Sequence, residues 1–193
     1  MGPAPFFVVG ILNVTPDSFY DGGHAADVDA AVAKGLALLE EGADILDIGG
    51  ESTRPFSEPV PADMELARVL PVVRGILAVR PDAVLSVDTT KASVARACLE
   101  AGALILNDVS AMDVDPELLQ VVRDFHPGYV LMHSLGRPRT MQVEPRYEDV
   151  MAEIMRFSKR SLKFWCVRGC PSPGLLLIPA SDLARLLNII LKY

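Results

Sequence analysis

The sequence predicts an α/β protein whose parallel strands alternate with helices, arranged as an incomplete (β/α)8 barrel of about five to six strand–helix units. Short apolar runs alternate strictly with longer amphipathic segments from residue 6 to about residue 162. The strand runs are mainly apolar, as in strands covered on both faces of a parallel sheet. Polar and glycine-rich residues follow the strands, which is where parallel α/β architectures place their sites.

The elements are delimited by turn signals. The first strand ends in the turn-rich residues 13–18, and the first helical pattern stops at Gly42. The predicted strands are Phe6–Leu12, Asp44–Ile48, Val84–Val87, Ala103–Leu106 and Tyr129–Met132. The predicted helices are Asp29–Glu41, Ala62–Val79, Lys91–Ala101, Pro116–Phe125 and Arg146 to about Leu162.

Two architectures fit this alternation, an open doubly wound sheet and a barrel. A Rossmann nucleotide fold is disfavoured because no G-x-G-x-x-G follows the first strand. We favour the barrel, although a barrel needs roughly 250 residues. The chain has 193 residues, so the barrel is expected to be incomplete.

Composition narrows the function classes. The net charge of -7 argues against a nucleic-acid partner, which needs a basic face. No apolar run is long enough for a membrane span, and the first residues lack a basic leader region, so we expect a cytoplasmic protein with no membrane partner. Cys98, Cys166 and Cys170 give no even disulfide framework, and the C-x-x-x-C spacing of the last two has no companion that would complete a zinc set.

Polar residues follow each predicted strand, and a barrel would bring them to one rim. Amides and carboxylates in such a ring can recognise a flat heterocycle with several N–H donors and acceptors. Asn13, near Thr15 and Ser18, could complete a site for a hard cation whose main ligand is phosphate. In strand order the residues are Asn13 and Asp17; Asp47, Thr53 and Arg54; Asp88 and Lys91; Asn107 and Asp108; and His133.

Two long motifs make the resemblance specific. The segment 10–19 reads Gly-Ile-Leu-Asn-Val-Thr-Pro-Asp-Ser-Phe and the segment 47–55 reads Asp-Ile-Gly-Gly-Glu-Ser-Thr-Arg-Pro. Both resemble signatures of the dihydropteroate synthase family. Shorter matches at 86–89, 105–108 and 131–133 follow in family order, so the resemblance covers residues 7 to about 160.

The resemblance implies a folate-pathway transferase on a (β/α)8 barrel. Such an enzyme joins p-aminobenzoate to (7,8-dihydropterin-6-yl)methyl diphosphate and releases pyrophosphate. By the same resemblance Asn13 binds Mg²⁺ with the diphosphate, Thr53 contacts that diphosphate, and Asp88 and Asn107 hold the pterin ring. The loops bearing Asn13 and Arg54 would close over the substrates. The family commonly forms homodimers, through helices that this chain is expected to lack.

Each of these residues also has an ordinary structural interpretation. Asn13 and Asn107 could be turn residues, and Asp88 could cap the following helix. Thr53 and Arg54 could belong to a solvated loop. His133 could be a hydrogen-bonded core histidine.

Two features depart from the family pattern. Phe56 stands where family members usually carry Gly, so the second loop is expected to be altered. Beyond about residue 160 the pattern is lost, yet neighbouring-frame codons across the segment 177–190 permit the family motif Asp-Pro-Gly-Ile-Gly-Phe-Gly-Lys-Thr-x-x-His-Asn. We therefore expect residues 1–163 to be the N-terminal part of a pterin-binding barrel and 164–193 to be an out-of-frame tail, truncating the family sequence. The nucleotide sequence of the locus decides this.

An incomplete barrel is expected to expose strand edges and apolar faces. The tail could supply a strand near Leu175 and a helix near Ser181 to Lys192. We expect poor solubility and little or no activity from this polypeptide alone. The alternatives are an inactive remnant, a pterin-binding module without catalysis, and a pterin-dependent methyltransferase domain.

Overall fold

A computed structural model describes residues 6–15, 25–51, 59–110, 112–133, 152, 155–157, 159–161, 175–179 and 190–191. The strands are β1 (Phe6–Phe7), β2 (Val9–Asn13), β3 (Ile45–Gly49), β4 (Val84–Asp88), β5 (Ile105–Asp108), β6 (Gly128–His133), β7 (Leu175–Pro179) and β8 (Ile190–Leu191). The helices are α1 (Ala25–Glu40), α2 (Ala62–Val79), α3 (Ala92–Glu100) and α4 (Leu118–Phe125).

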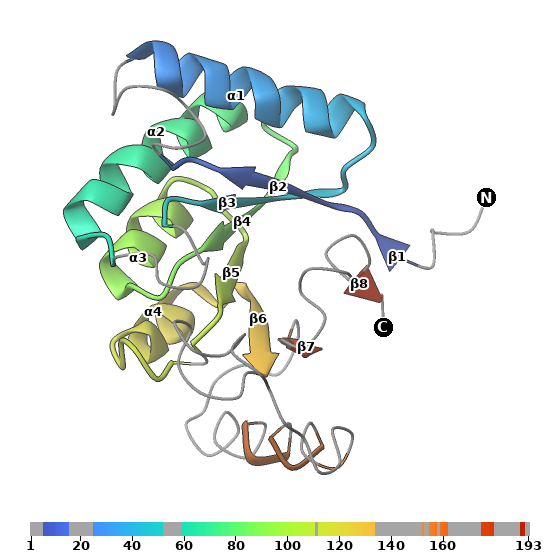
Figure 1. The fold of residues 1–193 in the computed structure, drawn as a ribbon, viewed down its shortest axis with the longest axis vertical. Coiled ribbons are helices and arrows are strands. Elements are labelled where there is room, and N and C mark those ends of the chain that lie inside the picture. The colour runs from blue at the N-terminus through green and yellow to red at the C-terminus, as the bar shows by residue number, and fades with distance from the viewer. Residues whose placement is uncertain are drawn as a thin grey trace.

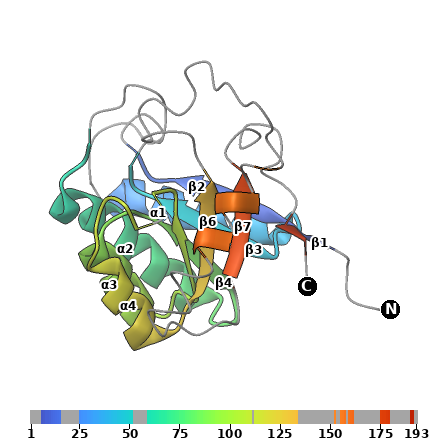
Figure 2. The same cartoon turned by 90° about the horizontal axis from the view of Figure 1, so that it is seen from below.

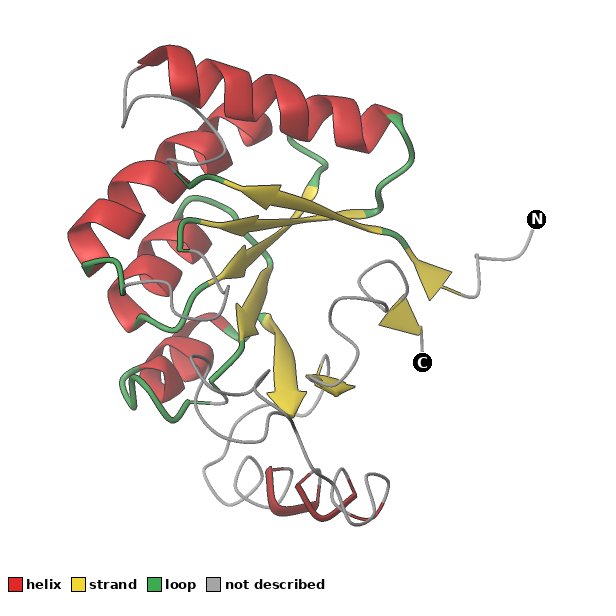
Figure 3. Ribbon diagram, viewed as in Figure 1, coloured by secondary structure: helices red, strands yellow, loops and turns green. Residues whose placement is uncertain are grey.

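Strands β2 to β7 form one six-stranded sheet in which spatial order equals chain order and every pairing is parallel. The four helices lie on one face of this curved sheet, as Figures 1 and 3 show. This confirms the predicted α/β class and the incomplete (β/α)8 barrel. The predicted bounds of α2 agree with the structure, whereas α1 begins four residues earlier than the apolar periodicity indicated.

The later part of the chain adds to the sheet. Strand β7 pairs in parallel with β6, with Leu177 opposite Leu131, and Figure 2 shows the two strands side by side. This confirms the strand expected near Leu175. The expected helix near Ser181 to Lys192 is wrong at Ile190–Leu191, which pair with the aromatic strand β1 in antiparallel fashion. β-branched and aromatic side chains favour such pairing. Residues 181–189 lie outside the described part.

The predicted helix over 146–162 is described only in part. Residue 152 and residues 155–157 and 159–161 are helical, in agreement with the prediction. Within the described residues no helix combines the length and the apolar character that crossing a membrane requires.

The core lies between the sheet and the helices. Leu46 and Ile48 of β3 and Leu85 of β4 are fully buried there. Because successive strand residues point to opposite faces, the intervening Asp47 and Gly49 face away from the helices. The alternation thus assigns one face of the sheet to packing and leaves polar side chains on the other.

The two longest helices approach each other closely. A side-chain carbon added at Gly75 of α2 would lie 2.6 Å from Val32 Cγ2 of α1, so only glycine fits at this crossing. This contact seats both helices against β2 and β3.

Candidate functional site

The sheet register aligns the strand-end residues that the sequence singled out. Asn13 is opposite Gly49, Gly49 is opposite Asp88, and Asp88 is opposite Asn107. Alternation places Asn13, Asp88 and Asn107 on the face away from the helices. The structure therefore brings these three side chains to one sheet edge, as the barrel interpretation predicted.

Gly49 separates Asn13 from Asp88 with an open position. A carbon added at Gly49 would lie 3.6 Å from Asn13 Oδ1 and 3.5 Å from Asp88 Oδ2. Both oxygens therefore border the same small space, and Asn13 is exposed to solvent there. An amide oxygen and a carboxylate oxygen together can accept hydrogen bonds from a polar ligand.

Asp47 lies one layer below and fixes the orientation of Asn107. The Nδ2 atom of Asn107 donates a 2.9 Å hydrogen bond to Asp47 Oδ2, which leaves the Asn107 carbonyl oxygen to accept from a ligand. Burial raises the pKa of Asp47, against the hydrogen bonds from Ser86 and Asn107, which lower it. Its other oxygen, Oδ1, is buried and has no hydrogen-bond partner among the described residues.

Asp88 lies near several other carboxylates at this end of the sheet. Burial raises its pKa well above the usual value, and the nearby carboxylates of Asp47, Glu65, Asp108 and Glu51 raise it further. No hydrogen bond within the described part of the chain offsets this repulsion. A ligand that donates N–H groups would supply the missing compensation.

Asp108 belongs to the other face of the sheet, which corrects the expectation that it lies on the ligand rim. It is fully buried on the helix side, as the two-residue period of β5 requires once Asn107 faces the ligand side. It accepts hydrogen bonds from Ser110 N at 2.8 Å, Ser110 Oγ at 2.6 Å, Met112 N at 2.6 Å and Tyr129 Oη at 2.6 Å. Met112 has φ +67°, so this carboxylate holds a strained loop in place.

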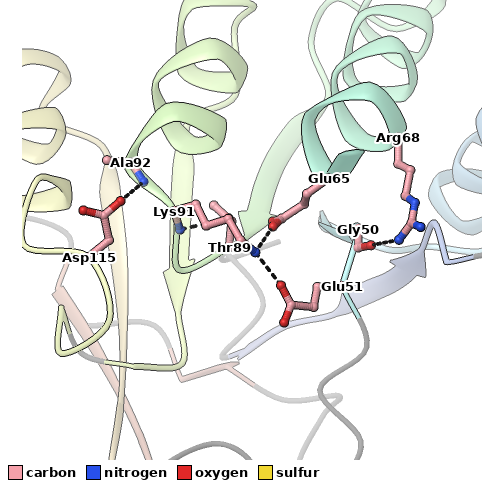
Figure 4. Close-up of polar contacts among 8 residues, drawn as sticks. All are labelled: Gly50, Glu51, Glu65, Arg68, Thr89, Lys91, Ala92 and Asp115. Atoms are coloured by element: carbon pink, nitrogen blue, oxygen red, sulfur yellow. Dashed lines mark hydrogen bonds and ion pairs between the residues drawn. The ribbon is translucent and has the colours of Figure 1, made fainter. Parts of the chain in front are cut away.

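Lys91 lies next to this edge and is paired with two carboxylates. Its Nζ atom donates to Glu51 after β3 and to Glu65 on α2, as Figure 4 shows. Burial acts to lower the pKa of Lys91, but the hydrogen bonds and charges of the two carboxylates outweigh it and raise the pKa. Lys91 therefore forms an ion cluster with Glu51 and Glu65 within the protein.

Asp88 is not a helix cap, so that alternative is wrong. The N-cap position of α3 is Lys91, and it makes no side-chain cap hydrogen bond. The first helical amide, Ala92 N, donates instead to Asp115 Oδ2 at 2.8 Å. Asp88 is thus left for another role.

The backbone ladder continues past the strand ends that carry the site. Val14 N donates to Gly49 O at 2.7 Å, and Thr89 N donates to Asn107 O at 3.1 Å. The residues that follow Asn13 and Asp88 are consequently tied to the neighbouring strands. The site is built on rigid sheet positions, which favours preorganised binding.

Several predicted residues lie outside the described part. These are Asp17, Thr53, Arg54, Phe56, Cys166, Cys170 and the side chain of His133. Among the described residues, no group of three or more His, Cys, Asp or Glu side chains could hold a metal ion.

Sequence reasoning did not single out Glu65. It falls on the buried stripe of α2 with Val69, Val72, Val73 and Ile76, at helical spacing. The signal in the sequence was a charged residue at a position where the helical periodicity predicts an apolar one.

A curved parallel sheet, helices on its outer face and an amide–carboxylate cluster at the strand ends define this chain as an incomplete α/β barrel. The chain belongs to the pterin binding enzyme family, which matches residues 9–177.

Named relatives agree with this family. The dihydropteroate synthase of Mycobacterium leprae is 46% identical over 158 residues, covering 80% of this chain and 54% of that protein. The Xanthomonas albilineans dihydropteroate synthase solved with 4-aminobenzoic acid is 47% identical with a TM-score of 0.78, covering 89% of this chain and 60% of that one. The Yersinia pestis enzyme in a sulfonamide complex is 42% identical with a TM-score of 0.81, covering 90% and 62%. The chain spans just over half the length of the relative from M. leprae.

Proposed function

We propose that this chain binds (7,8-dihydropterin-6-yl)methyl diphosphate and supports its condensation with p-aminobenzoate to dihydropteroate and pyrophosphate. The observation that carries the proposal is the register that aligns Asn13, Gly49, Asp88 and Asn107 along one sheet edge. The names of the relatives point to the same reaction.

The ring is assigned to Asp88 and Asn107. A pterin presents N–H donors and ring acceptors in one plane, and Asp88 accepts from those donors in this proposal. Burial and four neighbouring carboxylates raise the pKa of Asp88 in the unliganded protein. N–H groups of the ring would give the ionised carboxylate hydrogen bonds that the described residues do not supply. Asn107, held by Asp47 at 2.9 Å, adds an oriented amide beside it.

The diphosphate is assigned to Asn13, Thr53 and Arg54. Mg²⁺ is bound in proteins through few side-chain oxygens together with substrate phosphates, so the single amide oxygen of Asn13 fits a cation that arrives with the diphosphate. When bound, Mg²⁺ would stabilise the charge on the departing pyrophosphate. Asn13 would be its protein ligand, and Thr53 and Arg54 would contact the phosphate oxygens.

The reaction forms one C–N bond and breaks one C–O bond. The amine nitrogen of p-aminobenzoate attacks the methylene carbon of the pterin, the diphosphate leaves with the bonding electrons, and the amine proton passes to solvent. The protein residues hold the ring and orient the two reactants in line. Negative charge at Asp88 also favours the electron-poor pterin that develops as the leaving group departs.

We expect this chain alone to bind the ligand but to have a low turnover rate. Among the described strands, β2 and β7 each have one neighbour in the six-stranded sheet, so this part does not close into a barrel. The ring-binding residues lie in the middle of the sheet, on β4 and β5, where both neighbours are present. A cytoplasmic location and a homodimer stay predictions.

Titration calorimetry tests the proposal. The chain is titrated with dihydropterin diphosphate and, separately, with methyl-folate, and condensation is measured as pyrophosphate release with p-aminobenzoate. Binding of the diphosphate that is lost in Asp88→Asn supports the proposal. Binding without pyrophosphate release identifies a module without catalysis, a preference for methyl-folate identifies a methyltransferase-type domain, and no binding of either ligand by a folded chain overturns all three.

A further inference from the structure

The ion cluster of Lys91, Glu51 and Glu65 joins three segments of the chain, beside the strand ends that carry Asp88 and Asn107. Lys91 is three residues beyond Asp88, Glu51 is two residues beyond Gly49, and Glu65 belongs to the first turn of α2. The side chain of Glu65 is 1% exposed, that of Lys91 19% and that of Glu51 29%. Figure 4 shows the Lys91 amine between the two carboxylates.

The same helix also holds the backbone next to Glu51. A carbon added at Gly50 would lie 2.7 Å from Val69 Cγ2 and 3.0 Å from Glu65 Cγ, so the backbone of Gly50 packs directly on α2. The Nη1 atom of Arg68 donates to Gly50 O at 2.9 Å. Packing and a hydrogen bond fix residue 50, and the ion cluster fixes residue 51.

Stability alone does not account for this arrangement. Burying the Glu65 carboxylate carries a large desolvation penalty, and apolar side chains of similar volume often serve stability as well or better. One Glu65 oxygen, Oε1, is also buried without a hydrogen-bond partner among the described residues. Charged groups retained under such a cost are best attested where they specify one arrangement of the chain over its alternatives.

We propose that Lys91 is a positioning residue: by holding Glu51 against α2, it fixes the point at which the chain leaves β3 beside Asp88. This inference rests on the proposed function, because the residues that follow Glu51 include Thr53 and Arg54, the proposed diphosphate contacts. Lys91 N donates to Thr89 Oγ1 at 3.2 Å, which ties Lys91 to the turn after Asp88. The segment 88–91 therefore acts on both halves of the ligand. Asp88 contacts the ring, and Lys91, through Glu51, positions the diphosphate contacts.

The first test uses Glu51→Ala, Glu51→Gln and the control Glu41→Ala in the full chain. Glu41 is exposed in the turn after α1, at the opposite end of the strands. Affinities are measured for dihydropterin diphosphate and for 6-hydroxymethyl-dihydropterin, which has the ring without the phosphates. Glu51→Ala should weaken diphosphate-ligand binding roughly tenfold, the scale of a displaced binding group, while affinity for the ring ligand changes less than about threefold. Glu51→Gln should restore part of the loss, because its amide oxygen accepts from Lys91, and Glu41→Ala should match the parent.

Lys91→Met and Lys91→Arg give a second test through the other partner. Lys91→Met should show the same selective loss, and Lys91→Arg should lessen it; if Lys91→Met does not fold, the Glu51 series decides alone. Equal loss of both ligands in Glu51→Ala, or no loss of either, overturns the positioning role. A parent chain that binds neither ligand overturns the proposed function itself, which separates the two failures.

Discussion

Asp88 and Asp108 are carboxylates at the ends of neighbouring strands, yet their surroundings are opposite. Asp108 faces the helices, is fully buried and accepts four hydrogen bonds from Ser110, Met112 and Tyr129. Asp88 faces the other side and has a raised pKa, caused by burial and by four nearby carboxylates. A buried charge whose hydrogen bonds are all supplied by the protein serves the fold, whereas one left uncompensated is available to a ligand.

The Lys91 cluster lies between these two cases. Glu65 is as buried as Asp108, but within the described part of the chain its compensation comes from one cation, Lys91, which it shares with Glu51. Among the described residues the three carboxylates therefore form a series: Asp108 accepts four hydrogen bonds, Glu65 is paired with Lys91, and Asp88 has no hydrogen-bond partner. Substitutions along this series should separate residues that hold the fold from residues that bind.

The largest effect is expected from Asp108→Ala. The substitution leaves the Ser110, Met112 and Tyr129 donors without their acceptor in a buried site, which should cost about 4 kcal/mol of unfolding free energy. Urea denaturation followed by circular dichroism measures it. Asp113→Ala, an exposed aspartate in the same loop, is the matched control and should change little. A loss below that of Tyr129→Phe would contradict the structural role of Asp108.

Lys91→Met should come next, at about 3 kcal/mol, because it leaves the buried Glu65 charge without a partner. The double variant Lys91→Met with Glu65→Met should recover most of this loss, since no buried charge remains. Arg80→Met breaks an exposed ion pair with Asp82 and should have no measurable effect. If the double variant is no more stable than Lys91→Met, the unpaired buried charge of Glu65 is not the cause of the lost stability.

Tyr129→Phe removes one of the four donors to Asp108 and should cost about 1 kcal/mol. The loss should vanish when the substitution is made in the Asp108→Ala background, because the hydrogen bond is already absent there. Four denaturation curves complete this double-mutant cycle. Additive losses would show that Tyr129 acts on stability through contacts other than Asp108.

Asp88→Asn should have the smallest effect on stability and the opposite sign. The folded-state pKa of Asp88 is raised above its usual value of 3.8, so its stabilising contribution is fully present below about pH 4 and is lost as pH rises through the folded pKa. At pH 7.5 the carboxylate opposes folding, and the amide should raise Tm by a few degrees. The gain should disappear near pH 4, as thermal melts at both pH values would show. A lower Tm at pH 7.5 would mean that Asp88 is stabilised by contacts like those of Asp108.

Much of the fold could be predicted because hydrophobic periodicity and turn residues are local signals. The bounds of α2 follow from the apolar stripe, and the stop of α1 follows from Gly42, which has φ +105°. The meeting of Asn13, Asp88 and Asn107 could also be predicted, since parallel strands share one carboxyl edge. The face of Asp108 could not, because it depends on which of two adjacent residues in β5 points inward.

The ion cluster was beyond sequence reasoning for a different reason. Glu51, Glu65 and Lys91 are up to 40 residues apart, and their contact arises only when α2 and the turn after β4 pack together.

The out-of-frame origin of residues 164–193 stays a prediction. The family match runs to residue 177 and β7 pairs with β6, while the nucleotide sequence alone reports the reading frame.

The ladder bonds from Val14 to Gly49 and from Thr89 to Asn107 carry a consequence for dynamics. The amide hydrogens directly after Asn13 and Asp88 are locked in interstrand bonds, so they should exchange with deuterated solvent only when the sheet edge opens. Their exchange rates thus report how much of the time the strand ends that carry Asn13 and Asp88 are held together.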